Sequence, residues 1–188
     1  MDAYRFLANH FLIAVPSMSD PSFSRAVTLL CQHNEDGAMG LMINRLSDFT
    51  LGDILSQMNI QTENSELSAT PVLAGGPVQP ERGFVLHSET EQVWDSSFQI
   101  SKQLWLTTSR DILIAMADGQ GPAQAVVALG YAGWTAGQLE DELQDDAWLT
   151  VPAAPQIVFD TDLEQRWTAA ARLIGIDLNL LTSYSGHA

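Results

Sequence analysis

The sequence predicts an α+β fold in a single domain that spans residues 1–188. Two observations support this fold class. Short apolar segments rich in β-branched residues are separated by turn signals, as in hairpin-connected strands. A few longer segments carry apolar residues at helical spacing behind capping residues. With 46% apolar residues, a chain of 188 residues can bury one substantial core.

Three strands are expected in the N-terminal part. Residues 10–15 are a short apolar run that Pro16 stops. Residues 25–32 and 38–44 are apolar as well, and the turn signal Asn34-Glu-Asp-Gly37 lies between them. The latter two segments therefore predict a β-hairpin.

A short helix and a further strand follow. Thr50 is expected to cap a helix that runs to about Met58, because Asp53 stands at the third helical position and completes a capping box. Residues 59–70 are polar without periodicity and predict a loop. Residues 71–74 read as a strand that leads into Gly75-Gly76-Pro77.

The central part predicts two more strands and a buried helix. Residues 83–87 and 103–107 have strand composition. Residues 109–118 predict a helix capped by Ser109 or Thr108, and its side chains are apolar almost all round, as in a central buried helix. Gly119 and Gly121-Pro122 end it.

The C-terminal part contains the most informative motif, Gly130-Tyr-Ala-Gly-Trp134, after an expected strand at 124–129. We expect this motif to form a tight turn from strand to helix, because Thr135 and Gln138 have the capping-box spacing for a helix through Leu143. Strands are then expected at 148–151 and 156–159. A last helix is predicted behind a second capping box, Thr161 with Glu164, and ends at Gly175.

Charge and cysteine content exclude several classes of protein. The chain has 23 acidic and 8 basic residues, with Lys102 as its single lysine, so direct nucleic-acid binding is disfavoured and an anionic membrane surface would repel it. The lone Cys31 excludes an internal disulfide and fits a reducing, cytoplasmic location. No signal peptide or membrane span is recognisable. The histidines and the single cysteine form no metal-ligand set, and no cofactor motif occurs.

Five segments in order give the chain a family resemblance. They are Met18-Ser-Asp-Pro-Ser-Phe23, residues 33–44, Gly75-Gly-Pro-Val78, Arg82-Gly-Phe-Val-Leu-His87, and residues 129–140. In these segments the chain resembles the AlgH/YqgE family of bacterial proteins, although Leu46 stands where the family usually has proline. The resemblance implies an α+β fold with a bifurcated, mostly antiparallel sheet, part of which closes into a small barrel surrounded by helices. It implies no established enzyme activity and no cofactor.

The leading functional hypothesis is a cytosolic binding or indirect regulatory protein for an unknown small molecule or protein. Polar and aromatic residues at strand ends commonly serve sites, and the motif strands carry many of them. The candidate cleft residues are His33, Asn44, Arg45, Gly75, Gly76, Arg82, His87, Tyr131, Trp134 and Gln138. The competing interpretation is that these residues only hold the fold together. The oligomeric state is not determined by the sequence.

Three alternatives stay open. The first is a hydrolase or transferase with His33 or His87 as base, or with Glu140 in that role, because histidine titrates in the useful range. Cys31 and His33 also share a strand face and could form a thiolate and imidazolium pair, although a small buried thiol beside a turn histidine explains them equally. The third is a transcriptional regulator, for which direct DNA binding is disfavoured by the net charge of -15.

Overall fold

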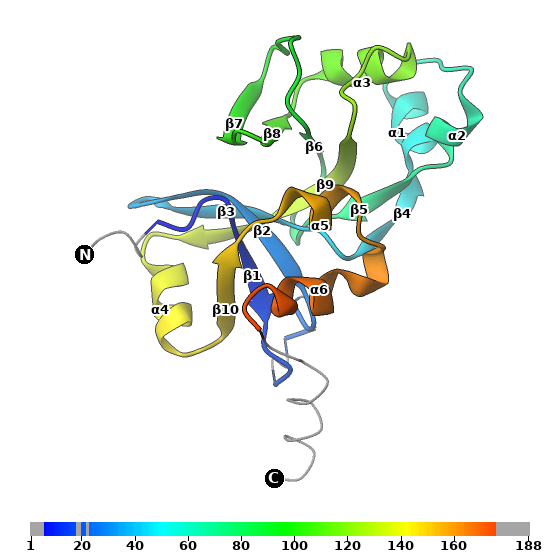
Figure 1. Cartoon of the computed structure of the whole chain (residues 1–188). Coiled ribbons are helices and arrows are strands. Elements are labelled where there is room, and N and C mark those ends of the chain that lie inside the picture. Colours follow the sequence, from blue (N-terminus) through cyan, green and yellow to red (C-terminus); the bar gives the residue numbers. More distant parts are fainter. Residues whose placement is uncertain (1–5, 18–19, 22, 176–188) are drawn as a thin grey trace.

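The computed structural model describes residues 6–17, 20, 21 and 23–175, which form an α+β fold around one curled, mostly antiparallel sheet (Figure 1). The strands are β1 (His10–Ala14), β2 (Val27–Asn34), β3 (Gly37–Met42), β4 (Leu46–Thr50), β5 (Pro71–Ala74), β6 (Val78–His87), β7 (Ser97–Ser101), β8 (Leu104–Thr107), β9 (Ala125–Thr135) and β10 (Trp148–Pro152). The helices are α1 (Leu51–Gln57), α2 (Ser65–Ser68), α3 (Arg110–Ala117), α4 (Gln138–Gln144), α5 (Pro155–Phe159) and α6 (Arg166–Arg172), with a short 3₁₀ helix, η2 (Leu163–Gln165), before α6.

The sheet forks along the long strand β9, which confirms the expected bifurcation. Its main path runs β10-β1-β2-β3-β9-β6-β8-β7. Residues 132–135 of β9 pair with β3, whereas residues 128–129 pair in parallel with β5, and β4 joins β5. On its other edge, β9 pairs with β6. One strand therefore belongs to both halves of the sheet, and the sheet curls into a half-barrel between them.

Glycines allow the close backbone approach at this fork. Gly130 has φ +75, and a Cβ there would overlap the carbonyl oxygen of Gly76. A Cβ on Gly76 would in turn overlap the backbone of Tyr131. The Gly75-Gly76 and Gly130-Tyr131 segments thus pack backbone to backbone. The Gly-Tyr-Ala-Gly-Trp motif is the fork of the sheet and lies inside β9, so the prediction of a strand-to-helix turn at 130–134 is wrong.

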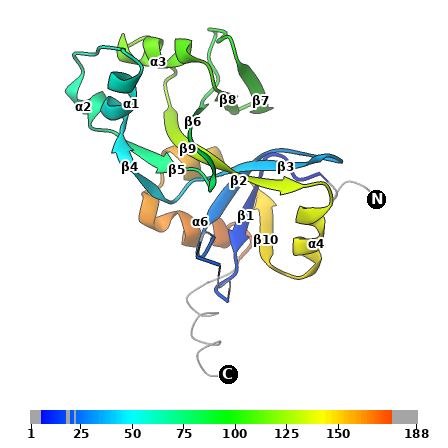
Figure 2. The ribbon, with the colours of Figure 1, turned by 180° about the vertical axis from the view of Figure 1, so that it is seen from behind.

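Helices cover the two halves of the sheet in separate groups (Figures 1 and 2). Helices α1 and α3 pack their apolar residues on the β5, β6 and β9 side of the fork. Helices α5 and α6 cover the core formed by β1, β2, β3 and β8. Helix α4 packs through Leu139 against Trp134 and Trp148.

Several local predictions are confirmed. Strands β2 and β3 form the expected hairpin across Asn34–Gly37. Thr50 and Asp53 make the capping box of α1, with both reciprocal hydrogen bonds present. Ser109 occupies the N-cap of α3 as expected, although its hydroxyl donates to Asp111 Oδ1 and makes no cap hydrogen bond. Leu46, at the position where the family usually has proline, begins β4.

Three expectations about helices are corrected. Residues 156–159, predicted as a strand, belong to α5, because Pro155 fits the first helical turn and one turn suffices to bury Ile157 and Val158. The predicted loop 59–70 contains α2, capped by Asn64, whose side chain accepts from the Leu67 N–H at 3.0 Å. Helix α3 is not buried all round, since Ile114 is exposed.

Both predicted C-terminal capping boxes are incomplete. Gly137, with φ +77, is the N-cap of α4, and the Gln138 side chain accepts from the Thr135 N–H at 3.0 Å. Thr161 hydrogen-bonds back to the Gln156 carbonyl and does not cap the η2 turn. The chain leaves α6 at Gly175, whose φ is +76.

Within residues 6–17, 20, 21 and 23–175, no helix has the length and apolar character that a membrane crossing requires.

Candidate functional site

The ten predicted site residues do not share a pocket in the described part of the chain. Gly75 and Gly76 lie at the fork. Asn44 and Arg45 hold a loop, and His33 and His87 are buried in the sheet. The other four border two separate pockets. Arg82 and Tyr131 line one of about 520 Å³, and Trp134 and Gln138 line one of about 500 Å³.

His33 has partners on both ring nitrogens. Its Nδ1 accepts the backbone N–H of Leu7 at 2.8 Å, so the proton of the neutral ring sits on Nε2 and is donated to Oε1 of Glu140. Phe6 packs edge-on against the ring, with centroids 5.6 Å apart. The Cys31 thiol meanwhile donates to the Leu29 carbonyl. His33 therefore joins the N-terminal segment to α4, and no pair with Cys31 forms.

His87 ends a chain of three side chains that are neighbours across strands β6, β8 and β7. Its Nδ1 lies 2.9 Å from the Ser88 carbonyl oxygen, which can only accept, so Nδ1 carries the proton. Nε2 must then accept from the Thr107 hydroxyl at 2.7 Å, and Thr107 in turn accepts from Ser97 at 2.6 Å. Burial lowers the pKa of His87, against the opposing effect of its hydrogen bond to Ser88. The imidazole is thus neutral and its Nε2 is a proton acceptor.

Trp134 and Gln138 are tied to one carboxylate. Oε1 of Glu142 accepts the indole N–H of Trp134 at 3.2 Å, and Oε2 accepts from Gln138 Nε2 at 3.0 Å. Trp134 is buried against Trp148 and Phe23. Trp134 is therefore a packing residue of this side of the sheet.

Asn44 and Arg45 hold the chain that enters β2. The Asn44 side chain accepts from the Val27 N–H at 2.9 Å and donates to the Arg25 carbonyl at 2.8 Å. Arg45 Nη2 donates to the Ser24 carbonyl at 2.7 Å. The backbone of Arg25 has φ 56, in the left-handed region that is unfavourable for a residue other than glycine, and these hydrogen bonds stabilise it.

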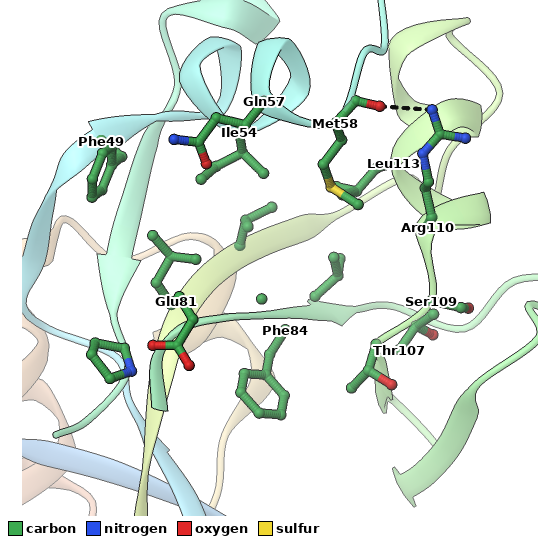
Figure 3. Close-up of a pocket in the computed structure, with 16 residues that line it drawn as sticks. Phe49, Ile54, Gln57, Met58, Glu81, Phe84, Thr107, Ser109, Arg110 and Leu113 are labelled. Carbon is green, nitrogen blue, oxygen red and sulfur yellow. Dashed lines mark hydrogen bonds between the residues drawn. The ribbon is translucent and has the colours of Figure 1, made fainter. Parts of the chain in front are cut away.

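A different pocket has the composition of a ligand site. It has a volume of about 550 Å³ and lies between helices α1 and α3 on one side and strands β6, β8 and β9 on the other (Figure 3). Ile54 and Met58 come from α1 and its C-terminal end, Leu113 comes from α3, and Val127 and Leu129 come from β9. Its volume lies in the range of pockets that bind small molecules, and such pockets also have mainly apolar walls.

Polar groups stand at the rim of this pocket. The charged residues are Glu81 and Arg110, which lie at opposite sides in Figure 3, and Arg110 Nη2 donates to the Met58 carbonyl at 2.7 Å. Phe49 forms part of the mouth and is 43% exposed, a high value for an aromatic residue of this size. An apolar interior with a few polar groups at its edge suits an amphipathic or apolar small molecule.

None of the ten predicted residues lines this pocket, and sequence reasoning missed all of those that do. The pocket collects residues from α1, α3, β4, β6, β8 and β9, which are far apart in the chain. Gly83 carries a signal, since glycine inside a strand is unusual, but the sequence predicts it as the first residue of a strand 83–87, whereas it lies inside β6. The remaining lining residues are of types that are ordinary in a core or on a surface, so no motif distinguishes them.

Comparison with known proteins gives a consistent result. A model of the family described as AlgH-like matches residues 11–179. A UPF0301 protein of Xanthomonas campestris pv. campestris (strain B100) is 59% identical over 182 residues, which cover 97% of this chain and 96% of the relative. A UPF0301 protein of Stenotrophomonas maltophilia (strain K279a) is 58% identical over 181 residues, with 96% of each chain covered.

Two solved structures are similar over almost the whole chain. The solution structure of the AlgH protein from Pseudomonas aeruginosa has a TM-score of 0.81 at 46% identity and covers 100% of this chain and 99% of that one. The crystal structure of a Corynebacterium diphtheriae protein has a TM-score of 0.76 at 20% identity, with 94% and 91% coverage. The second likeness concerns the fold alone.

Proposed function

The chain belongs to the AlgH-like family, and from this premise we propose that it is a binding protein whose site is the pocket between α1, α3 and the sheet. The observation that carries the proposal is a cavity of about 550 Å³ with apolar walls and a polar rim. An apolar cavity of this kind suits an apolar small molecule, because the transfer of that molecule from water into apolar surroundings is favourable. Any effect on gene expression would then be indirect, as the net charge of -15 opposes contact with DNA. The reduced, buried Cys31 fits action in the cytoplasm.

Phe49 offers a direct test of this site. It lines the mouth of the pocket and is 43% exposed, whereas Leu46, on the same strand, is 56% exposed and does not line the pocket. Both can be changed to serine at little cost to the core. The full chain would be titrated with N-phenyl-1-naphthylamine, an uncharged probe whose fluorescence rises in an apolar site.

The expected result is saturable binding by the wild type, an affinity about tenfold lower for Phe49→Ser, which corresponds to about 1.4 kcal/mol, and no change for Leu46→Ser. Thermal unfolding of each variant checks that the fold is kept. Absence of saturable binding by the wild type, or equal losses in the two variants, would contradict the proposal.

The chain of Ser97, Thr107 and His87 favours a second candidate, a hydrolase or transferase. Of the two predicted bases, His33 has its Nδ1 occupied by a backbone N–H and its Nε2 by Glu140, whereas Nε2 of His87 faces a hydroxyl that faces a second hydroxyl. Ser97, which is partly exposed, could lose its proton through Thr107 to His87. Ser97 also borders the pocket that contains Arg82.

A fluorophosphonate probe tests this candidate, because it phosphonylates an activated serine and releases fluoride. Intact-mass analysis should show one adduct that disappears in Ser97→Ala and persists in Ser96→Ala, the neighbouring serine of the same pocket. Thr107→Val should abolish the adduct as well, since it interrupts the route of the proton. A wild-type chain that remains unlabelled would remove the enzyme hypothesis based on His87.

A further inference from the structure

Gly83 differs from most of the other described glycines, because neither a close contact nor a positive φ requires the absence of a side chain there. An added Cβ would meet another atom at less than 3.0 Å in seven of them: Gly37, Gly40, Gly52, Gly75, Gly76, Gly121 and Gly130. Three more have a positive φ: Gly119, Gly137 and Gly175. A Cβ on Gly133 would rest in ordinary contact on the Tyr131 ring, at 3.4 Å. At Gly83 an added Cβ meets nothing within 4 Å, and φ lies outside the left-handed region.

The register of the sheet places this empty position in the pocket. Gly83 pairs with Leu129 across β6 and β9, and directly paired residues of antiparallel strands point to the same face. Val85, two residues further along β6, points to that face as well. Leu129 and Val85 both line the pocket, and so does Gly83 itself. A side chain at position 83 would therefore project into the cavity between those of Val85 and Leu129.

Glycine inside a strand weakens the strand, because it has a large backbone entropy to lose and no side chain to pack. Such a glycine is expected at an irregularity of the pairing, as between Val78 and Gly83 in β6, or where another group comes close to the backbone. At the fork of the sheet that group is another segment of the chain. At Gly83 no described residue takes the space, although the side chains of Ile54, Met58 and Leu113 extend toward the sheet from the opposite wall (Figure 3).

We propose that the bare backbone at Gly83 is the floor on which the ligand lies, and that the ligand carries a flat, uncharged apolar ring system. This inference rests on the proposed function of the pocket. A flat ring can lie at van der Waals distance, about 3.5–4.0 Å, from a strand backbone that has no Cβ, whereas a globular group would leave gaps on both of its sides. The apolar side chains of α1 and α3 then cover the other face of the ring. The charged groups stay at the rim, where Glu81 and Arg110 are exposed to solvent.

A size series at one residue tests the inference without disturbing the fold. Gly83→Ala, Gly83→Val and Gly83→Phe add increasing volume to the floor, and the added Cβ has no atom to displace. Gly133→Ala is the matched control, because it removes a glycine of β9 that lies outside this pocket and tolerates a Cβ. The flat probe N-phenyl-1-naphthylamine is displaced by either flat 2-naphthol or globular 1-adamantanol, which have the same number of carbon atoms.

We expect 2-naphthol to compete about tenfold better than 1-adamantanol with the wild-type chain, a difference of about 1.4 kcal/mol. Probe affinity should fall in the order Ala, Val, Phe at position 83, while Gly133→Ala stays at the wild-type value and the melting temperatures of all variants stay within a few degrees of the wild type. If the wild type binds the probe but Gly83→Phe binds it equally well, or if 1-adamantanol competes as well as 2-naphthol, the inference is wrong and the proposed function stands. If the wild type binds no probe, both fail.

Discussion

The indole N–H of Trp148 donates to Oε1 of Glu142 at 2.9 Å. The indole of Trp134 donates to the same oxygen, and both rings are buried. Glu142→Ala should therefore leave two indole donors without their acceptor and lower the free energy of unfolding by about 2 kcal/mol. Urea denaturation followed by tryptophan fluorescence measures the loss.

Two variants serve as controls for Glu142. Glu142→Gln keeps an acceptor oxygen and should lose less than half as much as Glu142→Ala. Asp141→Ala changes an exposed carboxylate on the same helix and should have almost no effect. If Asp141→Ala costs as much as Glu142→Ala, the loss reflects the helix and its charge, and the shared acceptor is not its cause.

The lowered pKa of His87 should make the free energy of unfolding depend on pH. Burial lowers its pKa in the folded state, so below about pH 6.5 the unfolded chain binds a proton more readily than the folded chain does. The free energy of unfolding should consequently rise with pH between the lowered pKa and about 6.5, with a contribution of at most about 1.4 kcal/mol per pH unit, and this contribution should be constant above that range.

Urea denaturation of the wild type and of His87→Gln at a series of pH values measures this contribution. The variant should be less stable at neutral pH because it loses the hydrogen bond to Thr107, but its stability should fall less steeply on acidification. Equal slopes for the wild type and His87→Gln would show that His87 does not titrate differently in the two states.

Cys31 should be inert in the folded protein. Its side chain is buried, its Sγ donates to the Leu29 carbonyl, and burial raises the pKa of the thiol to about 12. Because the thiolate is the reactive form, an aromatic disulfide reagent at pH 8 should modify no thiol in the native state and one thiol in urea. Rapid modification of the native chain would contradict the buried position.

Arg166 should resist conservative replacement. Its Nε donates to the Thr161 carbonyl at 3.0 Å and its Nη1 to the Ile43 carbonyl, so it joins α6 to the end of β3 from a buried position. A lysine carries one compact head group and cannot reproduce this fork. Arg166→Lys should lower the free energy of unfolding by about 2 kcal/mol.

The matched control is Arg172→Lys in the last turn of the same helix, where the arginine is exposed. It should change stability by less than about 0.5 kcal/mol. The difference between the two variants, measured by urea denaturation, isolates the buried fork. Equal effects at both positions would show that Arg166 contributes no more than a surface arginine.

Much of the local structure could be predicted because it depends on neighbouring residues. The capping box of Thr50 and Asp53 closes within four residues, and the turn at Asn34–Gly37 joins two strands that are consecutive in the chain. The errors occur where a distant contact overrides the local pattern. Residues 130–134 look like a turn, yet they extend β9 because β3 and β6 are available on its two edges. The 156–159 segment has strand composition, yet Pro155 and the core beneath it favour a helical turn.

The candidate site depended on distant contacts even more strongly. The predicted site residues of the motifs, such as His33 and Trp134, form hydrogen bonds with other parts of the chain and pack inside the fold. The pocket is instead lined by residues like Phe49, Val85 and Leu113, whose types are common in any core or strand. Sequence patterns detect residues that act together at short spacing in the chain. A pocket is instead defined by the space left between elements that are distant in the chain.

The sequence by itself determined the fold class, the family, the acidic charge that opposes nucleic acid, and the caps and turns that define most elements. These properties follow from composition and from interactions between residues close together in the chain. Only the tertiary structure decided that β9 carries the fork, that Nε2 of His87 accepts from a hydroxyl while Nδ1 of His33 accepts from a backbone N–H, and that an unfilled space lies above Gly83. The reason is physical: burial, hydrogen-bond direction and empty volume are set by atoms that meet only after the chain has folded.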